Sequence, residues 1–196
     1  MNARAWWQLA VLSIRDPAQA AVALLAMRPG RDVLWPALLL AAALNTLVFS
    51  LSDILLPAPP VFPPILHQPL AYFAMITLGL VGFIQLLTWI GRLLGGQGGF
   101  ADMMVLLVWL QYLRLLVQAA ALVLVLTLPV LSLVVVAAAT IVGVYILLHF
   151  VSKAHGLNSL GRAAITLILT MLAMAFAISI LIALLGGPVL ESAQHV

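Results

Sequence analysis

The sequence has no cysteine and very few charged side chains. Without cysteine the chain can form no disulfide, no thiolate nucleophile and no thiolate metal site. Charged residues make up 7% of the 196 positions, whereas soluble domains carry about 25%. The chain therefore lacks the polar surface that a soluble globule needs. Seven of its eight Lys and Arg residues flank apolar segments, a pattern that indicates membrane topology and no nucleic-acid partner.

Long apolar runs dominate the composition. Hydrophobic residues account for 66% of the chain, and the mean hydropathy is +1.28. Runs of about 20 apolar residues match the hydrocarbon thickness of a bilayer when they are helical, whereas β-barrel strands would be shorter and would alternate with polar residues. The sequence therefore predicts an all-α, polytopic membrane helical bundle in contact with the lipid bilayer. The five predicted transmembrane helices cover residues 34–56, 70–90, 101–128, 130–151 and 160–185.

The first 32 residues follow a different pattern. We expect two short interfacial helices here, one over residues 5–14 and a second that Asp16 caps, with Pro17 at its first position. Asp32 is the expected N-cap of the first span. The predicted parts of the chain are a cytoplasmic or interfacial segment over residues 1–32, a five-helix transmembrane domain over 33–187 that ends at a Gly-Gly-Pro stop, and a short tail over 188–196.

The positions of the basic residues predict an orientation. With five spans, the N-terminus and the loops at 91–101 and 152–162 lie on one side of the membrane, and these segments hold every Lys and Arg except Arg114. By the positive-inside rule that side is cytoplasmic. We therefore expect a cytoplasmic N-terminus and a C-terminus on the opposite side.

Arg114 falls near the middle of the third predicted span. A charged side chain at that depth costs roughly 2.5–3.5 kcal/mol on insertion scales, so it is expected to face a protein interior or a wet cavity. Gln111 and Gln118 are three and four residues away and share its helical face. Asn45 and Gln85 add amides to the first two spans, and no carboxylate matches Arg114 in predicted depth. The candidate intramembrane polar site is therefore Gln111, Arg114, Gln118, Asn45 and Gln85.

Three interpretations of Arg114 stay open on the sequence alone. The polar residues can act as contacts between helices, with Arg114 satisfied by backbone carbonyls. They can instead form a site for an anion or a substrate. In the third interpretation residues 100–113 lie in the membrane plane and Arg114 is interfacial, although this leaves only about 15 residues before Pro129, fewer than the roughly 17 that a span needs.

The sequence contains no catalytic constellation. The four histidines are dispersed, no two carboxylates are paired within a span, and no serine or threonine has a matched histidine. The GGQGG loop at Gly95–Gly99 lacks the Lys-Ser or Lys-Thr of a phosphate-binding loop, and we expect it to form a tight turn. We therefore predict no enzyme activity, no cofactor, no metal site and no soluble substrate.

The order and spacing of several short motifs resemble the Yip1 domain family in its bacterial branch, over roughly residues 14–187. The first span begins with Leu34-Trp35-Pro36, and the Asp-Leu-Tyr-Gly-Pro motif of eukaryotic members is matched by Asp32 and Pro36. Those members are Golgi and endoplasmic-reticulum proteins linked to Rab GTPases and vesicle traffic. The loop residues that carry the resemblance are Asp32, Pro36, Gly95, Gly96, Phe100, His155, Gly156 and Arg162.

The resemblance implies a non-enzymatic membrane-embedded protein, here one of the bacterial inner membrane with a periplasmic C-terminus. The first functional hypothesis is a protein that organises the membrane or binds partners, either further copies of itself as a homo-oligomer or other membrane proteins. The alternative is a small transporter or channel whose path uses the polar face around Arg114. The two differ in one respect, because only the second requires Arg114 to line a hydrated path across the membrane.

Overall fold

The computed structural model describes residues 3–56 and 68–192, and these segments are helical apart from short connections. Of the predicted tail, residues 193–196 lie outside the described residues. The described helices are α1 (Ala3–Arg15), α2 (Pro17–Ala26), α3 (Arg31–Leu55), α4 (Pro69–Leu93), α5 (Phe100–Thr127), α6 (Pro129–His155) and α7 (Leu160–Ser192).

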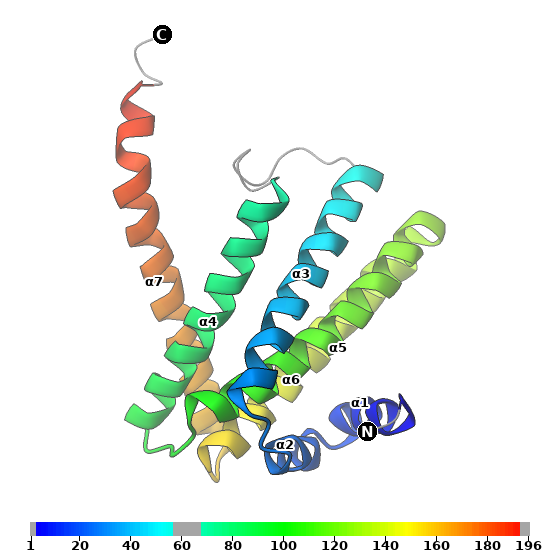
Figure 1. The fold of residues 1–196 in the computed structure, drawn as a ribbon, viewed down its shortest axis with the longest axis vertical. Helices are drawn as coiled ribbons and strands as arrows, with labels where there is room; N and C mark the ends of the chain where they lie inside the picture. Colours follow the sequence, from blue (N-terminus) through cyan, green and yellow to red (C-terminus); the bar gives the residue numbers. More distant parts are fainter. Residues whose placement is uncertain (1–2, 57–67, 193–196) are drawn as a thin grey trace.

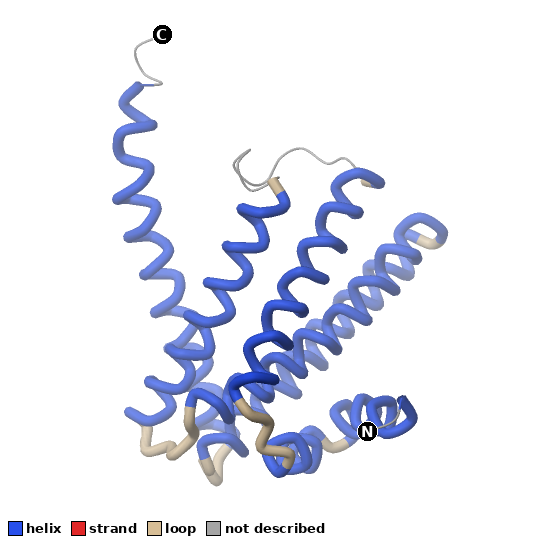
Figure 2. The backbone as a smooth tube through the Cα atoms, viewed as in Figure 1, coloured by secondary structure: helices blue, strands red, loops and turns tan. Residues whose placement is uncertain are grey.

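Five of these helices are long and apolar enough to cross a membrane, as the sequence predicted. Figure 1 shows α1 and α2 at one end of the five long helices, lying across their direction, and Figure 2 shows the short loops that join α4 to α5 and α6 to α7 at the same end. We call this end the base. The chain is therefore an all-helical membrane protein with two short N-terminal helices, which confirms the predicted fold class.

Local contacts explain where α2 begins and how α1 is held against the long helices. The Asp16 side chain accepts a hydrogen bond from the backbone amide of Gln19 at 3.0 Å, and Pro17 occupies the first position of α2. Both features confirm the predicted start of that helix. The α1 helix is attached to α5 through Trp109, which stacks on Trp6 with ring centroids 5.5 Å apart and donates a hydrogen bond to the Ser13 hydroxyl at 2.9 Å.

Two predicted helix boundaries were wrong. The N-cap of α3 is Gly30, and Asp32 lies in the first turn, where its carboxylate still faces the positive end of the helix dipole. The sequence placed the end of the last span at the Gly-Gly-Pro stretch, but α7 continues through it to Ser192. Helix propensity is a weak preference that a long apolar helix can override.

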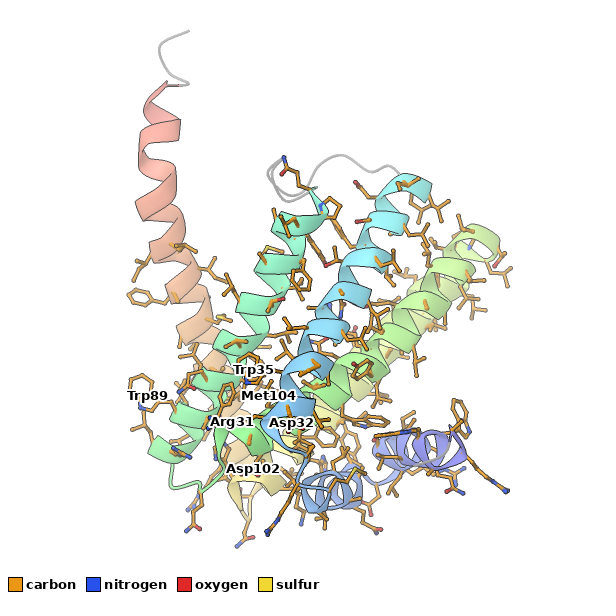
Figure 3. The ribbon with its side chains drawn as sticks, viewed as in Figure 1. Arg31, Asp32, Trp35, Trp89, Asp102 and Met104 are labelled. Atoms are coloured by element: carbon orange, nitrogen blue, oxygen red, sulfur yellow. The ribbon has the colours of Figure 1, made fainter. Side chains whose placement is uncertain are left out.

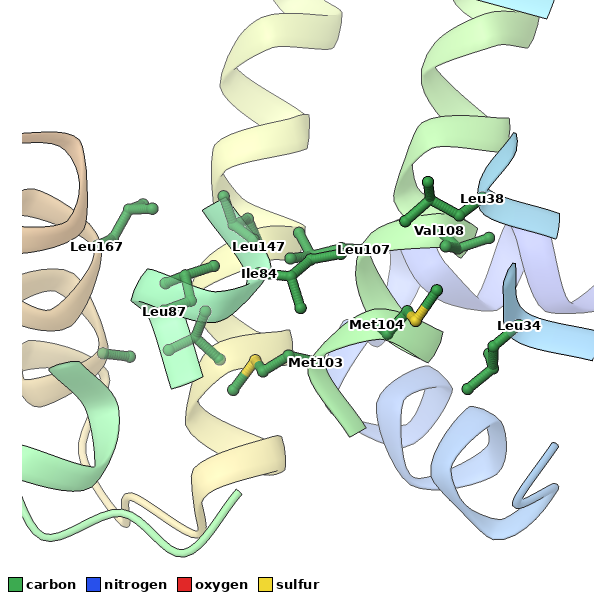
Figure 4. Close-up of a cluster of buried hydrophobic side chains, with 12 residues drawn as sticks. Leu34, Leu38, Ile84, Leu87, Met103, Met104, Leu107, Val108, Leu147 and Leu167 are labelled. Carbon is green, nitrogen blue, oxygen red and sulfur yellow. The ribbon is translucent and has the colours of Figure 1, made fainter. Parts of the chain in front are cut away.

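The hydrophobic core of the five spans lies entirely at the base. It is formed where α3, α5 and α7 begin and where α4 and α6 end, and Figure 4 shows these side chains meeting between the helices. A second cluster joins α1 and α2 to α5 and α6. The first cluster comprises Leu34, Leu38, Ile84, Leu87, Met103, Met104, Leu107, Val108, Leu147, Val151, Ala163 and Leu167.

Beyond the base the long helices diverge. Figure 1 shows α3, α4 and α7 spreading apart above the core, while α5 and α6 run together at a steep tilt. The upper halves of the helices therefore expose much apolar surface, with Leu133 and Phe176 both about 70% accessible (71% and 69%). Figure 3 shows that the labelled charged side chains Arg31, Asp32 and Asp102 lie at the base. The diverging helices leave cavities between them, and polar side chains in the upper half of the bundle line these cavities.

Candidate functional site

The Arg114 side chain is carried by one continuous helix. α5 runs from Phe100 to Thr127 without a break, and it forms a single candidate span. The interpretation in which residues 100–113 lie separately in the membrane plane was therefore wrong. The short remaining segment already counted against it, and one 28-residue helix can accommodate its length by tilting across the bilayer.

Arg114 and Gln111 line a cavity of about 310 Å³ between α3, α4, α5 and α7, which we call the Arg114 crevice. Asn45 reaches it from α3 and Met174 from α7. Its longest wall belongs to α4. The α4 residues that line it are Tyr72, Met75, Ile76, Gly79, Leu80 and Phe83.

A second cavity, of about 290 Å³, contains Gln118, and we call it the Gln118 cavity. It shares Asn45 and Tyr72 with the Arg114 crevice, so the two openings adjoin. Tyr72 is fixed there by Phe49, whose ring stacks on it with a centroid separation of 4.0 Å. The Gln118 Oε1 atom is buried and has no hydrogen-bond partner, the only such side-chain atom found among the described residues.

The charge of Arg114 has no counter-ion in the described part of the chain. The side chain is exposed, and no described group accepts a hydrogen bond from it. Its charge acts on the Tyr72 hydroxyl, but no carboxylate lines either cavity. No described backbone carbonyl is hydrogen-bonded to Arg114, and the interpretation in which the polar residues act as contacts between helices stays a prediction.

The structure brings four of the five candidate residues together and leaves one apart. Asn45 belongs to both cavities, Gln111 and Arg114 to one, and Gln118 to the other. Gln85 is exposed on α4 and lines neither cavity. Sequence reasoning missed Tyr72, which lies only one turn from the start of α4. A hydroxyl at the end of an apolar span was the signal that could have found it.

A second feature, at the base, gathers several of the loop residues that carry the family resemblance. His155 ends α6 and is only 2% exposed. Its Nδ1 atom accepts a hydrogen bond from the Gly98 amide at 3.2 Å, and its Nε2 atom lies 3.1 Å from the Leu87 carbonyl oxygen. Since a carbonyl can only accept, Nε2 carries the proton and the ring is neutral.

Glycines are needed around this ring because they leave room for it. A Cβ atom on Gly96 would stand 2.6 Å from His155 Nδ1, and one on Gly98 would stand 2.9 Å from the same atom. A Cβ on Gly91 would overlap the ring, coming within 2.5 Å of Cδ2 and closer still to Nε2 and Cε1. We call His155 with Gly91, Gly96 and Gly98 the His155 cluster. It joins the α4–α5 loop to the end of α6.

The remaining loop residues have local roles around this cluster. Gly95 and Gly156 adopt positive φ values of 89° and 65°, a region that suits glycine, and Gly156 is the C-cap of α6. Phe100 lies against Trp35 with ring centroids 6.3 Å apart, which connects the loop to the start of α3. Pro36 lies within α3, and Arg162 is exposed near the start of α7.

The described residues contain no group of three or more His, Cys, Asp or Glu side chains that could hold a metal ion. The arrangement instead offers a packed base and an open polar crevice. Comparison with known protein families matches residues 11–181, most of the chain, to the Yip1 domain. Comparisons with curated proteins and with solved structures give no match.

Proposed function

Because the chain belongs to the Yip1 domain family, we propose that it is a non-enzymatic inner-membrane protein that organises the membrane by binding a partner. The family consists of multi-span membrane proteins that are generally non-enzymatic. The more specific part of the proposal, the binding of a partner, rests on the Arg114 crevice. In this proposal the Arg114 crevice is a binding site, and the molecule that fills it is supplied from outside the chain.

One observation carries the proposal: the crevice contains a cation, and no described residue supplies a counter-ion to it. An arginine facing hydrocarbon is costly, so a group that supplies acceptors lowers the free energy of the protein in the membrane. The base below the crevice is closed by core side chains such as Leu38, Ile84 and Leu87, each 0% exposed. The crevice residues Leu80 and Phe83 pack against this core, and a crevice that ends at a packed core favours binding over conduction.

The proposed orientation places the base in the cytoplasm and the C-terminus in the periplasm of a bacterial cell. The helices α1 and α2, the α4–α5 loop and the α6–α7 loop lie together at the base. These segments, together with the helix ends and the α2–α3 connection that adjoin them, carry every Lys and Arg except Arg114, and basic residues flanking spans are retained on the cytoplasmic side. Labelling of single introduced cysteines tests this, because the chain has none of its own. A cysteine at Arg15 should be protected from an impermeant reagent in intact cells.

Photo-cross-linking in native membranes tests the binding proposal. A photoreactive residue at Met75, which lines the Arg114 crevice, should give an adduct of defined mass. The matched control is the same residue at Leu133, which is exposed on α6 and lines neither cavity. If Met75 gives the same unspecific pattern as Leu133, the crevice has no resident partner and the proposal fails. Adducts to a second copy would identify a homo-oligomer, and adducts to another protein a heteromeric partner.

The alternative function, a small transporter or channel, is favoured by the polar lining of the crevice. It requires the closed base to open, and it requires Arg114 in the path. Arg114→Leu should then abolish flux of an anionic solute in reconstituted vesicles, while Arg15→Leu should not. Equal flux for wild type and the Arg114 variant, or no flux for either, excludes this function.

A further inference from the structure

We propose that the Arg114 crevice holds the headgroup of an anionic phospholipid that enters from the membrane leaflet away from the base. This inference rests on the proposed function, because it names the chemical class of the molecule that completes the crevice. Three features of the crevice lead to it: its charge, its position along α4, and the apolar character of its walls.

The charge of the crevice requires an anion. Arg114 supplies a guanidinium, which pairs with the oxygens of a phosphate through two parallel hydrogen bonds. Gln111 lies one turn away on the same helix, and Asn45 lines the same crevice from α3, where its Nδ2 atom donates a hydrogen bond to the Ala41 carbonyl at 2.9 Å. No carboxylate lines the crevice. An anionic headgroup therefore meets a cation and amide groups with no opposing negative charge.

The position of the crevice points to the leaflet away from the base. Its α4 wall begins at Tyr72, three residues from the start of that helix, and extends to Phe83 near its middle. Eleven residues of helix correspond to about 16 Å, roughly half the hydrocarbon thickness. The crevice thus runs from the far end of the bundle toward its core. Arg114 lines this crevice from α5.

The walls of the crevice favour a lipid over a soluble anion. Met75, Ile76, Leu80 and Met174 line it beside the cation, and such side chains contact acyl chains well. Its volume of about 310 Å³ lies at the lower end of the range for ligand sites, about 300–1,000 Å³. That volume suits a headgroup and its glycerol, so the acyl chains would extend along the exposed apolar surfaces of α4 and α7.

Lipid titration of the purified full-length protein tests the inference. Thermal stabilisation and native mass spectrometry are measured with phosphatidylglycerol, with zwitterionic phosphatidylcholine, and with glycerol 3-phosphate as a soluble anion. We expect phosphatidylglycerol to bind wild type most tightly. Arg114→Gln should weaken it about tenfold or more, since a hydrogen bond to a charged group contributes that much affinity. Arg114→Lys should retain part of the binding.

A second variant reaches the same site by the opposite chemical change. Gly79 lines the crevice, and a Cβ there would meet no atom within 4 Å. Gly79→Asp should therefore fold, neutralise Arg114 from within and displace the lipid, whereas Gly79→Ala should bind it normally. Arg15→Gln is the charge-matched control, because this arginine is exposed on α1 and lines neither cavity.

The outcomes separate the lipid from other occupants. Equal loss of phosphatidylglycerol in the Arg114 and Arg15 variants would show general surface attraction and overturn the inference. Equal affinity for glycerol 3-phosphate would show that the ligand is a soluble anion and also overturn it. If lipid binding is insensitive to Arg114 while Met75 cross-links to a protein, the lipid inference fails and the proposed function stands. If neither lipid nor protein is found, both fail.

Discussion

Substituting Gly91 by alanine should destabilise the protein through the His155 cluster. Gly91 lies in the last turns of α4, and the added Cβ would overlap the imidazole of His155. The ring cannot move aside freely, because it is 2% exposed and is held on both nitrogen atoms, by the Gly98 amide and the Leu87 carbonyl. Either the ring leaves its two partners, or α4 and α6 separate.

The size of the effect follows from three contributions. Forcing an extra methyl group into a packed site typically costs about 1–3 kcal/mol. The two hydrogen bonds contribute about 0.5–1.5 kcal/mol each, and part of this is lost when the ring shifts. Alanine is better than glycine in a helix by about 0.5–1 kcal/mol, which offsets part of the cost. The free energy of unfolding should therefore fall by about 2–4 kcal/mol.

Equilibrium unfolding in mixed micelles measures this change, with Gly79→Ala as the matched control. Gly79 lies in the same helix and a Cβ there would meet no atom within 4 Å. That variant should be neutral or slightly more stable. In a His155→Ala background the ring is gone, so the added cost of Gly91→Ala should nearly vanish, a coupling that a double-mutant cycle detects. If Gly91→Ala were as stable as Gly79→Ala, the reasoning about this cluster would be refuted.

Three further predictions concern the base. Trp109→Phe removes the donor to the Ser13 hydroxyl, so α1 should detach more readily. The amides of residues 3–15 should then exchange faster with deuterium, and their protection free energy should fall by about 1 kcal/mol; unchanged exchange would contradict this. Asp16→Ala removes the cap of α2 and should lower the free energy of unfolding by about 1 kcal/mol, while Asp16→Asn should not. Acidification below about pH 6.5 should destabilise wild type. The unfolded chain binds protons on its histidines in this range, whereas in the folded chain a proton on Nδ1 of His155 would abolish the acceptor of the Gly98 hydrogen bond. His155→Gln should reduce this pH dependence.

The helices themselves were predictable from the sequence. Apolar runs fix where a span can lie, and Pro17, Pro69 and Pro129 each occupy the first position of a described helix, where proline lacks no needed hydrogen bond. The boundary at Asp32 was wrong by two residues, since glycine is also among the favoured N-cap residues and α3 begins directly after Gly30. The prediction for the end of α7 was wrong because glycine and proline, although they disfavour a helix, do not end this long apolar one.

The arrangement of the candidate site was only partly predictable. Spacing on one helix correctly grouped Gln111 with Arg114, because that relation is local. Depth was estimated by counting residues along upright helices, and this estimate could not show that Arg114 and Tyr72 line the same crevice. The contact between Gly98 and His155 joins positions 57 residues apart. No periodicity within a helix encodes such a contact, so it appears only in the folded chain.

The residues that stabilise the fold and the residues of the proposed binding site lie in different parts of the molecule. The buried cluster and His155 lie at the base, whereas the crevice begins where the helices diverge. Sites that admit ligands are commonly built in the less stable part of a structure, because a packed core leaves no room for them. Removing the charge of Arg114 takes away no hydrogen bond or ion pair among the described residues and removes an insertion cost. Substitutions at Arg114 should therefore change what the protein binds while leaving it as stable as wild type, and substitutions at Gly91 should do the reverse.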